Sequence, residues 1–304
     1  MLFRSAGQDH IRATLTNAIR NQRVGHAYIF VGTRGIGKTT SARIFAKALN
    51  CQNPSEEMEP CCKCPSCIEI MEGRNLNVFE IDGASNRGID DIRQLNETVG
   101  YAPSGSGCKI FIIDEAHMLT KEAFNALLKT LEEPPENVKF FLATTEPHKI
   151  PPTIISRCQR FDVKRIPTTS IVQKLQQMVE ERGASYEEEA LHRIASLSDG
   201  SMRVAESLLD QILCFAKGPI TEASVADSLA TVSTDAFFAL DKAFAEKDMR
   251  FAFTFADTIF SSGKDLTYFL ECLLEHYRNI LSLQMQIPLE GAPSSLQEKY
   301  QNSS

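Results

Sequence analysis

The chain has 304 residues, of which 43% are hydrophobic and 23% are charged. This composition is typical of soluble globular proteins, and the length allows two or three domains. A formal net charge of −7 disfavours a protein that holds nucleic acid alone through a broad basic face. No apolar run approaches the roughly 20 residues that cross a bilayer. The first residues also lack the apolar core of a signal peptide, so we expect a cytoplasmic protein without a membrane partner.

The first half of the chain alternates between helical and strand patterns. Apolar spacing predicts a helix over residues 10–19, and a short apolar run predicts a buried strand at 27–31. We then expect a helix at 39–49, a cysteine-rich loop to about 67, a strand at 78–81, a helix at 89–99, a strand at 109–113, a helix at 121–132 and a strand at 140–143. This alternation predicts a doubly wound α/β fold with a parallel sheet over about the first 165 residues.

After Pro167 the pattern becomes helical, with breaks near Gly183, Gly200 and Gly218. We expect one α/β domain over residues 1–166 and a small helical domain over 167–229. A second helical segment is expected over 230–304, ending in a polar tail beyond Pro288.

A phosphate-binding pattern, G-x-x-x-x-G-K-[ST], lies between the first predicted strand and the next helix. In such loops glycines let backbone N–H groups cradle phosphates, the lysine reaches the β- and γ-phosphates, and the threonine hydroxyl binds Mg²⁺. A glycine turn beside a surface lysine is the alternative, and the strand–loop–helix context disfavours it. We therefore expect ATP and Mg²⁺ to bind here, at Gly32, Thr33, Arg34, Gly35, Ile36, Gly37, Lys38, Thr39 and the adjoining Thr40.

An acidic pair, Asp114-Glu115, ends the strand predicted at 109–113. Ligands of open α/β sheets bind at the carboxyl ends of the strands. Asp114 is therefore expected to position Mg²⁺ and Glu115 to act as the general base on water. Thr145, after the strand at 140–143, and Arg203, in the helical part, are weaker candidates for contacts with the γ-phosphate.

Five of the nine cysteines fall between residues 51 and 67. Cys61-x₂-Cys64-x₂-Cys67, with Cys51 before it, supplies enough thiolates for a closed tetrahedral Zn²⁺ site. Bacterial ferredoxins share the C-x₂-C-x₂-C spacing, but their following C-x₃-C-P is missing. Unmetallated thiols remain an alternative, and Cys62 is a spare thiol that could replace a neighbour.

Three segments carry a family resemblance. They are Asn125–Glu136 (NALLKTLEEPPE), Asp114–Leu119 (DEAHML) and Ser156-Arg157-Cys158. They resemble bacterial DNA polymerase III subunit gamma/tau, the AAA+ ATPase motor of the sliding-clamp loader. The resemblance runs from about residue 7 to about 280 and is densest between residues 32 and 158.

The resemblance implies roles that the residues alone do not fix. Thr145 takes the first sensor position and Arg203 the second, and Arg157 becomes an arginine finger that acts in trans on the ATP of a neighbouring subunit. Residues 167–229 become the lid domain, and residues 230–304 a partial oligomerisation collar. A zinc module at the same place in the family assigns its four ligands as Cys51, Cys61, Cys64 and Cys67.

The implied activity is ATP hydrolysis within the DNA-directed DNA polymerase III holoenzyme, to load the sliding clamp on primed DNA. The implied partners are the delta and delta-prime subunits, further gamma/tau copies, the clamp and DNA. The intact phosphate loop separates the chain from delta-prime. The family's N-terminal Tyr-Arg-Pro-x-x-Phe stretch is not found before Gly7, and the chain stops before a full collar would end.

Two other functions fit parts of the sequence. A AAA+ remodelling ATPase or helicase could share the loop, although the Ser156–Cys158 element beside a cysteine-rich insertion disfavours it. A non-catalytic scaffold subunit could bind nucleotide only for stability. Ser85–Gly88, which opens the helix at 89–99, with Arg93 on that helix, is our candidate for DNA contact, and a capped surface helix explains it equally well.

Overall fold

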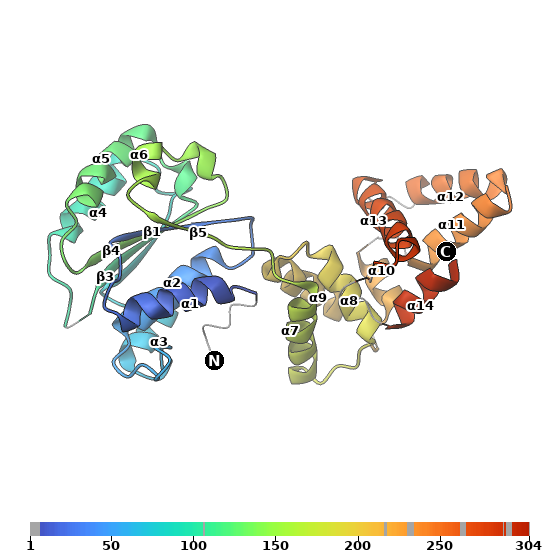
Figure 1. The fold of residues 1–304 in the computed structure, drawn as a ribbon, viewed down its shortest axis with the longest axis horizontal. Helices are drawn as coiled ribbons and strands as arrows, with labels where there is room; N and C mark the ends of the chain where they lie inside the picture. The colour runs from blue at the N-terminus through green and yellow to red at the C-terminus, as the bar shows by residue number, and fades with distance from the viewer. Residues whose placement is uncertain are drawn as a thin grey trace. The chain divides into compact units, whose positions relative to one another are not determined.

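The computed structural model describes residues 7–105, 107–215, 218–229, 234–261, 266–287, 289 and 294–303. Two compact units follow one another along the chain, Met1–Ile166 and Pro167–Ser304 (Figure 1). Among the described residues, none of the helices combines the length and the apolar character that crossing a membrane requires.

The first unit is built on a five-stranded sheet whose paired strands all run parallel. The spatial order β2-β3-β4-β1-β5 places β1 between β4 and β5. The bounds are Ala27–Val31 for β1, Val78–Asp82 for β2, Lys109–Asp114 for β3, Val138–Thr144 for β4 and Gln159–Asp162 for β5. All five residues of β1 are buried, as expected of a central parallel strand with both faces covered.

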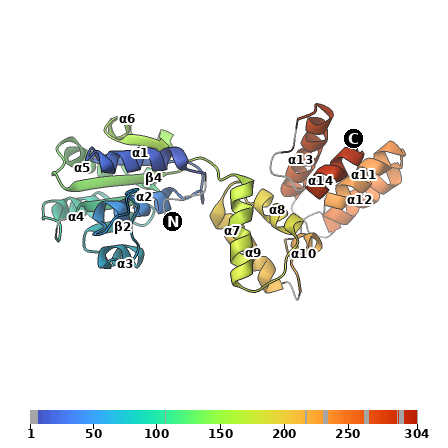
Figure 2. The same cartoon turned by 60° about the horizontal axis from the view of Figure 1, so that its bottom comes forward.

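Helices cover both faces of this sheet (Figures 1 and 2). One face packs against α1 (Asp9–Arg20) and α2 (Lys38–Asn50), where Tyr28 and Phe141 of the sheet meet Phe45 of α2. The other face packs against α4 (Ile89–Val99), α5 (Lys121–Glu132) and the short α6 (Pro152–Ile155). The remaining short elements are α3 (Pro65–Met71) and the 3₁₀ turns η1 (Ala116–Met118) and η2 (Pro147–Lys149).

The predicted parallel α/β fold is confirmed, but the sequence patterns did not predict its short elements α3, α6, η1 and η2 or the edge strand β5. β5 is an edge strand with the sequence Gln-Arg-Phe-Asp and mostly exposed side chains, so it carries no apolar run. α3 lies partly inside the stretch predicted as cysteine-rich loop and has only seven residues, which is too short for a clear helical period.

The second unit is helical. Its bounds are α7 Thr168–Glu181, α8 Glu188–Leu197, α9 Met202–Phe215, α10 Glu222–Ser228, α11 Thr234–Ala245, α12 Met249–Ser261, α13 Leu266–Gln284 and α14 Ser294–Ser303. α7 packs against α8 and α9 through fully buried residues such as Leu175, Leu191 and Leu209. The predicted boundary between lid and collar, at 229/230, stays a prediction, because residues 230–233 lie outside the described part.

Within the predicted polar tail beyond Pro288, residues 294–303 form the helix α14. Its aromatic residue Tyr300 is buried and lies against Phe238 and His276. The hydroxyl of Tyr300 is 3.1 Å from His276 Nδ1, and Asp241 Oδ2 is 2.6 Å from His276 Nε2. One aromatic side chain with these partners is enough to anchor a helix that is otherwise polar.

Candidate nucleotide and zinc sites

The predicted nucleotide residues of the first unit meet at one edge of the sheet. β3, β4 and β1 are successive neighbours, so their carboxyl ends lie side by side. Two backbone hydrogen bonds join the segments beyond those ends. Gly32 N donates to Thr144 O at 3.2 Å, and Gly83 N donates to Asp114 O at 2.8 Å. The phosphate loop, the acidic pair and the two threonines after β4 therefore share the edge at which open parallel sheets bind ligands.

Two glycines of the phosphate loop are required by its backbone. Gly37 has φ +98°, a left-handed conformation that L side chains rarely adopt. A Cβ at Gly32 would lie 2.6 Å from Val163 O. Between them, buried Ile36 anchors the loop in the core. The loop follows β1 directly and ends where α2 begins, so the positive end of that helix faces the residues that precede it.

Lys38 is the first residue of α2 and is almost fully buried. Its ammonium group donates a hydrogen bond to Thr33 O at 2.9 Å, across the loop. Thr33, Arg34 and Thr40 are exposed, and Gly35 and Thr39 are half-buried. The lysine is thus held over a loop in which Thr33, Arg34, Gly35 and Thr39 are accessible to a ligand, while Ile36 is buried.

Glu115 has an unusual backbone. Its φ of +45° is left-handed, which costs a non-glycine residue free energy and is often found at functional sites. Its N–H donates to Asp114 Oδ1 at 3.0 Å. Its carboxylate Oε2 accepts a hydrogen bond from Thr145 Oγ1 at 3.3 Å. The predicted base and the predicted first sensor are therefore in contact.

His117 is a functional candidate that the sequence patterns do not single out. It lies in η1, two residues after Glu115, and its side chain is 6% exposed. Its Nδ1 is 3.1 Å from Thr144 Oγ1 and 3.5 Å from Glu115 Oε2. Its Nε2 is 3.3 Å from Glu146 Oε1. In the sequence, the one indication is a histidine shortly after an acidic pair. Its possible role becomes apparent only when β3 and β4 are known to be neighbouring strands.

Arg157 lies just after α6, and its guanidinium contacts its own subunit. Nη2 donates to Glu132 Oε1 at 2.6 Å, and Nη1 donates to Thr153 O at 2.7 Å. Burial raises the pKa of the adjacent Cys158 to about 12, in keeping with a packing role for that thiol. Arg203, the predicted second sensor, is exposed near the start of α9 in the second unit, and its approach to the phosphates stays a prediction.

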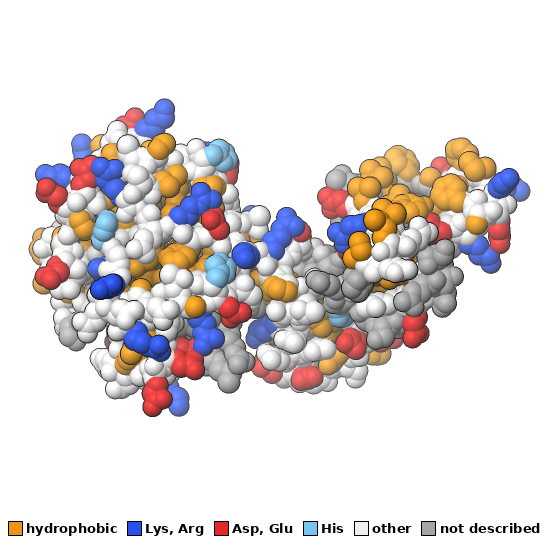
Figure 3. Space-filling model, viewed as in Figure 1, with side chains coloured by type: hydrophobic (Ala, Val, Ile, Leu, Met, Phe, Trp, Pro, Cys, Tyr) orange, Lys and Arg blue, Asp and Glu red, His pale blue; other side chains and the backbone are white. Residues whose placement is uncertain are grey.

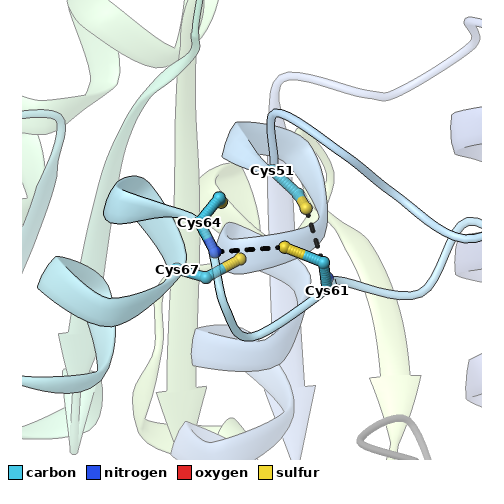
Figure 4. Close-up of side chains that lie close together, drawn as sticks. All are labelled: Cys51, Cys61, Cys64 and Cys67. Carbon is cyan, nitrogen blue, oxygen red and sulfur yellow. Dashed lines mark hydrogen bonds between the residues drawn. The ribbon is translucent and has the colours of Figure 1, made fainter.

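The four predicted zinc ligands come together (Figure 4). The sulfurs of Cys51, Cys61, Cys64 and Cys67 all lie within 4.8 Å of one another. Sulfurs around a tetrahedral zinc with bonds of about 2.3 Å would be about 3.8 Å apart, so a small contraction would form the site. Backbone N–H groups already point at two of the sulfurs, from Cys61 to Cys51 Sγ at 3.2 Å and from Cys64 to Cys61 Sγ at 3.3 Å.

The thiols of this cluster differ in acidity. Backbone N–H groups, that of Lys63 first, lower the pKa of Cys61 to about 6. Burial raises the pKa of Cys51 and of Cys67. The spare thiol, Cys62, lies outside the group of four and accepts a hydrogen bond from Lys47 Nζ at 3.8 Å.

The candidate DNA segment forms a tight turn before α4. Arg87 and Arg93 are exposed. Arg87 Nε donates to Ala84 O at 2.9 Å, and Arg93 is 3.1 Å from Asp90. Two acidic residues also occupy the first turn of α4, so the local charge is mixed and DNA contact stays a prediction.

Comparison with known proteins assigns the family. The family model described as "DNA polymerase III, delta subunit" matches residues 7–167, and the model of the clamp loader subunit ATPase lid domain matches residues 170–218. The chain is also similar to Thermotoga maritima RuvB, a Holliday junction branch migration motor. That likeness has a TM-score of 0.55 at 18% identity and covers 80% of this chain and 78% of that one, so it speaks for the AAA+ fold alone.

Relatives narrow the family further. DNA polymerase III subunit tau of Bacillus subtilis is 46% identical, over 94% of this chain and 50% of that protein. The tau subunit of Escherichia coli is 43% identical, over 79% of this chain and 37% of that protein. The gamma subunit of Buchnera aphidicola subsp. Acyrthosiphon pisum is 39% identical, over 97% of this chain and 81% of that protein. This chain thus spans half or less of the two tau proteins and most of a gamma protein. It belongs to the gamma/tau family of bacterial DNA polymerase III clamp-loader subunits.

Proposed function

We propose that this chain is an ATP-hydrolysing motor subunit of the bacterial DNA polymerase III clamp loader. The observation that carries the proposal is the contact between Glu115 and Thr145 at the same sheet edge as an intact phosphate loop. Family membership supplies the setting. A subunit that served only as a scaffold would need the loop for nucleotide binding but would not need a positioned carboxylate beside it.

Each residue of the site has a role in this proposal. The backbone of Gly32–Thr39 would hold the phosphates, and Lys38 would add a positive charge near the γ-phosphate. Thr39 and Asp114 would hold Mg²⁺, which supplies charge neutralisation to the phosphate oxygens. Glu115 would accept a proton from the attacking water. Thr145, bonded to Glu115, would place that carboxylate relative to the γ-phosphate.

Hydrolysis would be completed by a second subunit. Arg157 contacts Glu132 and Thr153 of its own chain, and on the strength of the family resemblance we assign it to the ATP of a neighbour. The partners would be further gamma/tau copies with the delta and delta-prime subunits, and the assembly would act in the cytoplasm on the sliding clamp and primed DNA. Arg203 would reach the γ-phosphate from the lid.

We also propose that the Cys51, Cys61, Cys64 and Cys67 cluster holds a structural zinc ion. Four sulfurs within 4.8 Å of one another make a complete tetrahedral donor set with no open position for a reacting ligand. Zinc would supply folding free energy to the segment between α2 and α3. The nucleotide site would need no chemistry from it.

The test is the ATPase rate of the assembled loader with and without clamp and primed DNA. Wild type should be stimulated by DNA. In Arg157→Ala the DNA-stimulated ATPase rate should fall by about 10³-fold or more, the range found for arginine fingers. Nucleotide binding should be retained. The matched control is Arg160→Ala, because Arg160 is an exposed neighbour whose ion pair among the described residues is with Asp162 on its own strand. Turnover that is absent or unstimulated in wild type would favour a scaffold.

A further inference from the structure

A buried histidine joins the catalytic strand end to its neighbour. His117 follows β3, and its ring contacts Thr144 at the last position of β4 and Glu146 just beyond it. Its side chain is 6% exposed, whereas that of His148 is 73% exposed. Burying an imidazole between polar partners costs free energy unless those partners are paired with it. The placement of His117 therefore requires the two strand ends to keep their relative position.

The partners of His117 are themselves fixed. Thr144 Oγ1 accepts a hydrogen bond from Glu146 N at 3.1 Å. The Glu146 carboxylate is 2.8 Å from Lys149 Nζ, and this hydrogen bond holds the pKa of Glu146 below its usual range. Glu146 is thus an anion at neutral pH that can accept a hydrogen bond from Nε2. The imidazole is held on both of its nitrogens.

Glu115 is the least closely held member of this group. Its backbone is left-handed, and Oε2 of its carboxylate has Thr145 Oγ1 at 3.3 Å and His117 Nδ1 at 3.5 Å. The Thr145 hydrogen bond is long, and catalytic hydrogen bonds of ligand-free enzymes commonly tighten in the reacting complex. The His117 ring lies against the same carboxylate oxygen as a close contact. Removing the ring would leave the carboxylate with one long hydrogen bond and a space to turn into.

We propose that His117 is a positioning residue that holds the Glu115 carboxylate against the Thr144–Glu146 segment, in the orientation needed to accept a proton from water. The inference rests on the proposed function, since it assumes that Glu115 serves ATP hydrolysis. It assigns His117 no contact with nucleotide. Removing the His117 side chain should therefore leave nucleotide affinity unchanged. It should lower kcat, because a displacement of about 1 Å at a reacting group can cost on the order of 10²-fold in rate.

The test compares His117→Ala and His117→Gln with His148→Ala in the assembled, DNA-stimulated loader. His148 is the matched control because it lies 3.6 Å from the same Glu146 carboxylate but is exposed. We expect kcat to fall by about 10- to 100-fold in His117→Ala, less in His117→Gln, whose amide keeps a donor, and not at all in His148→Ala. Binding of a fluorescent ATP analogue and the melting temperature report whether each variant is folded.

A double-mutant cycle with Glu115→Gln separates positioning from a general loss of structure. If His117 acts through Glu115, His117→Ala will change the residual rate of the Glu115→Gln protein by less than about threefold. The inference is overturned if kcat is unchanged in His117→Ala, or if nucleotide affinity falls together with kcat in both His117 variants. It is also overturned if His117→Ala lowers the rate by the same factor in the wild-type and Glu115→Gln backgrounds. If Glu115→Gln itself hydrolyses ATP like wild type, or wild type does not hydrolyse it, the proposed function fails as well.

Discussion

At the scale of single residues, the side chains proposed to act on ATP are held by hydrogen bonds and ion pairs to neighbouring groups. Lys38 donates to a carbonyl of its own loop, Glu115 accepts from Thr145, and Arg157 pairs with Glu132. Catalytic groups need this support, because a side chain free to rotate spends most of its time outside the reactive geometry. Changes in the supporting neighbours should therefore lower turnover more than nucleotide binding.

Glu132 offers a test of this support for the arginine finger. Its ion pair with Arg157 is exposed, so the pair contributes at most about 1 kcal/mol. We expect Glu132→Gln to leave the melting temperature unchanged and to lower the DNA-stimulated ATPase rate by about two- to fivefold, the equivalent of that energy. Glu133→Gln, one residue along, is the control. Equal rates in the two variants would show that Glu132 does not orient the finger.

Gly83 lies against the backbone of Asp114 and Glu115, at a position where a side chain would not fit. A Cβ at this position would lie 2.9 Å from the carbonyl oxygens of both Asp114 and Glu115, and neither backbone oxygen can rotate away. Gly83→Ala should therefore destabilise the first unit by about 1–3 kcal/mol, as overpacking does, and lower the ATPase rate even well below the melting temperature. At Gly100 the nearest atom to a new Cβ is 3.7 Å away, so Gly100→Ala should melt and turn over like wild type.

At the scale of elements, the cysteine cluster holds a segment with little other structure. The chain from Cys51 to Cys64 contains no helix or strand, and α3 begins directly after Cys64. If zinc fills the cluster, Cys64→Ser should lower bound zinc well below about one ion per chain and make this segment sensitive to protease. Cys62→Ser should keep the metal, since its sulfur is outside the group of four. Metal analysis and limited proteolysis check both, and a metal-free wild type with intact thiols would contradict the assignment.

Elements with a strong local signal were predictable from the sequence, and those defined by distant partners were not. The bounds of β1, α4 and α5 agree with the patterns, because each has a full apolar period. β5 owes its existence to pairing with β1, and α14 is anchored by Tyr300, so neither has a local signature.

The same distinction holds for the candidate site. The phosphate loop and the acidic pair carry their own spacing, so the residues alone predicted them. The roles of Thr145 and Arg157 and the choice of zinc ligands came from the family resemblance. His117 and Glu132 act through contacts between segments 25 or more residues apart, to Thr144 and to Arg157. Such contacts follow from strand order and helix packing, which no local pattern specifies.

At the scale of the whole molecule, the second unit exposes a large apolar surface. Large side chains of α12 and α13 remain in contact with solvent, among them Phe253, Phe260 and Leu274, which are 72%, 76% and 71% exposed. Figure 3 shows such side chains gathered over the C-terminal helices. Apolar patches of this kind mark protein–protein contacts, in agreement with the collar that the family resemblance implies. An assembly formed there would bring nucleotide sites and fingers of different chains together.

Subunit mixing tests whether the finger of one chain serves the site of another. Lys38→Ala keeps the finger and loses the phosphate lysine, whereas Arg157→Ala keeps the site and loses the finger. Loaders assembled from either variant alone should be nearly inactive, because a finger contributes about 10³- to 10⁵-fold. Co-assembled variants should recover a substantial part of the DNA-stimulated rate, since some interfaces then pair an intact site with an intact finger. Mixing Arg157→Ala with the double variant Lys38→Ala/Arg157→Ala should recover nothing, because no chain then has a finger, and recovery there would show that Arg157 is not required. No recovery in the first mixture would place the finger on the ATP of its own chain.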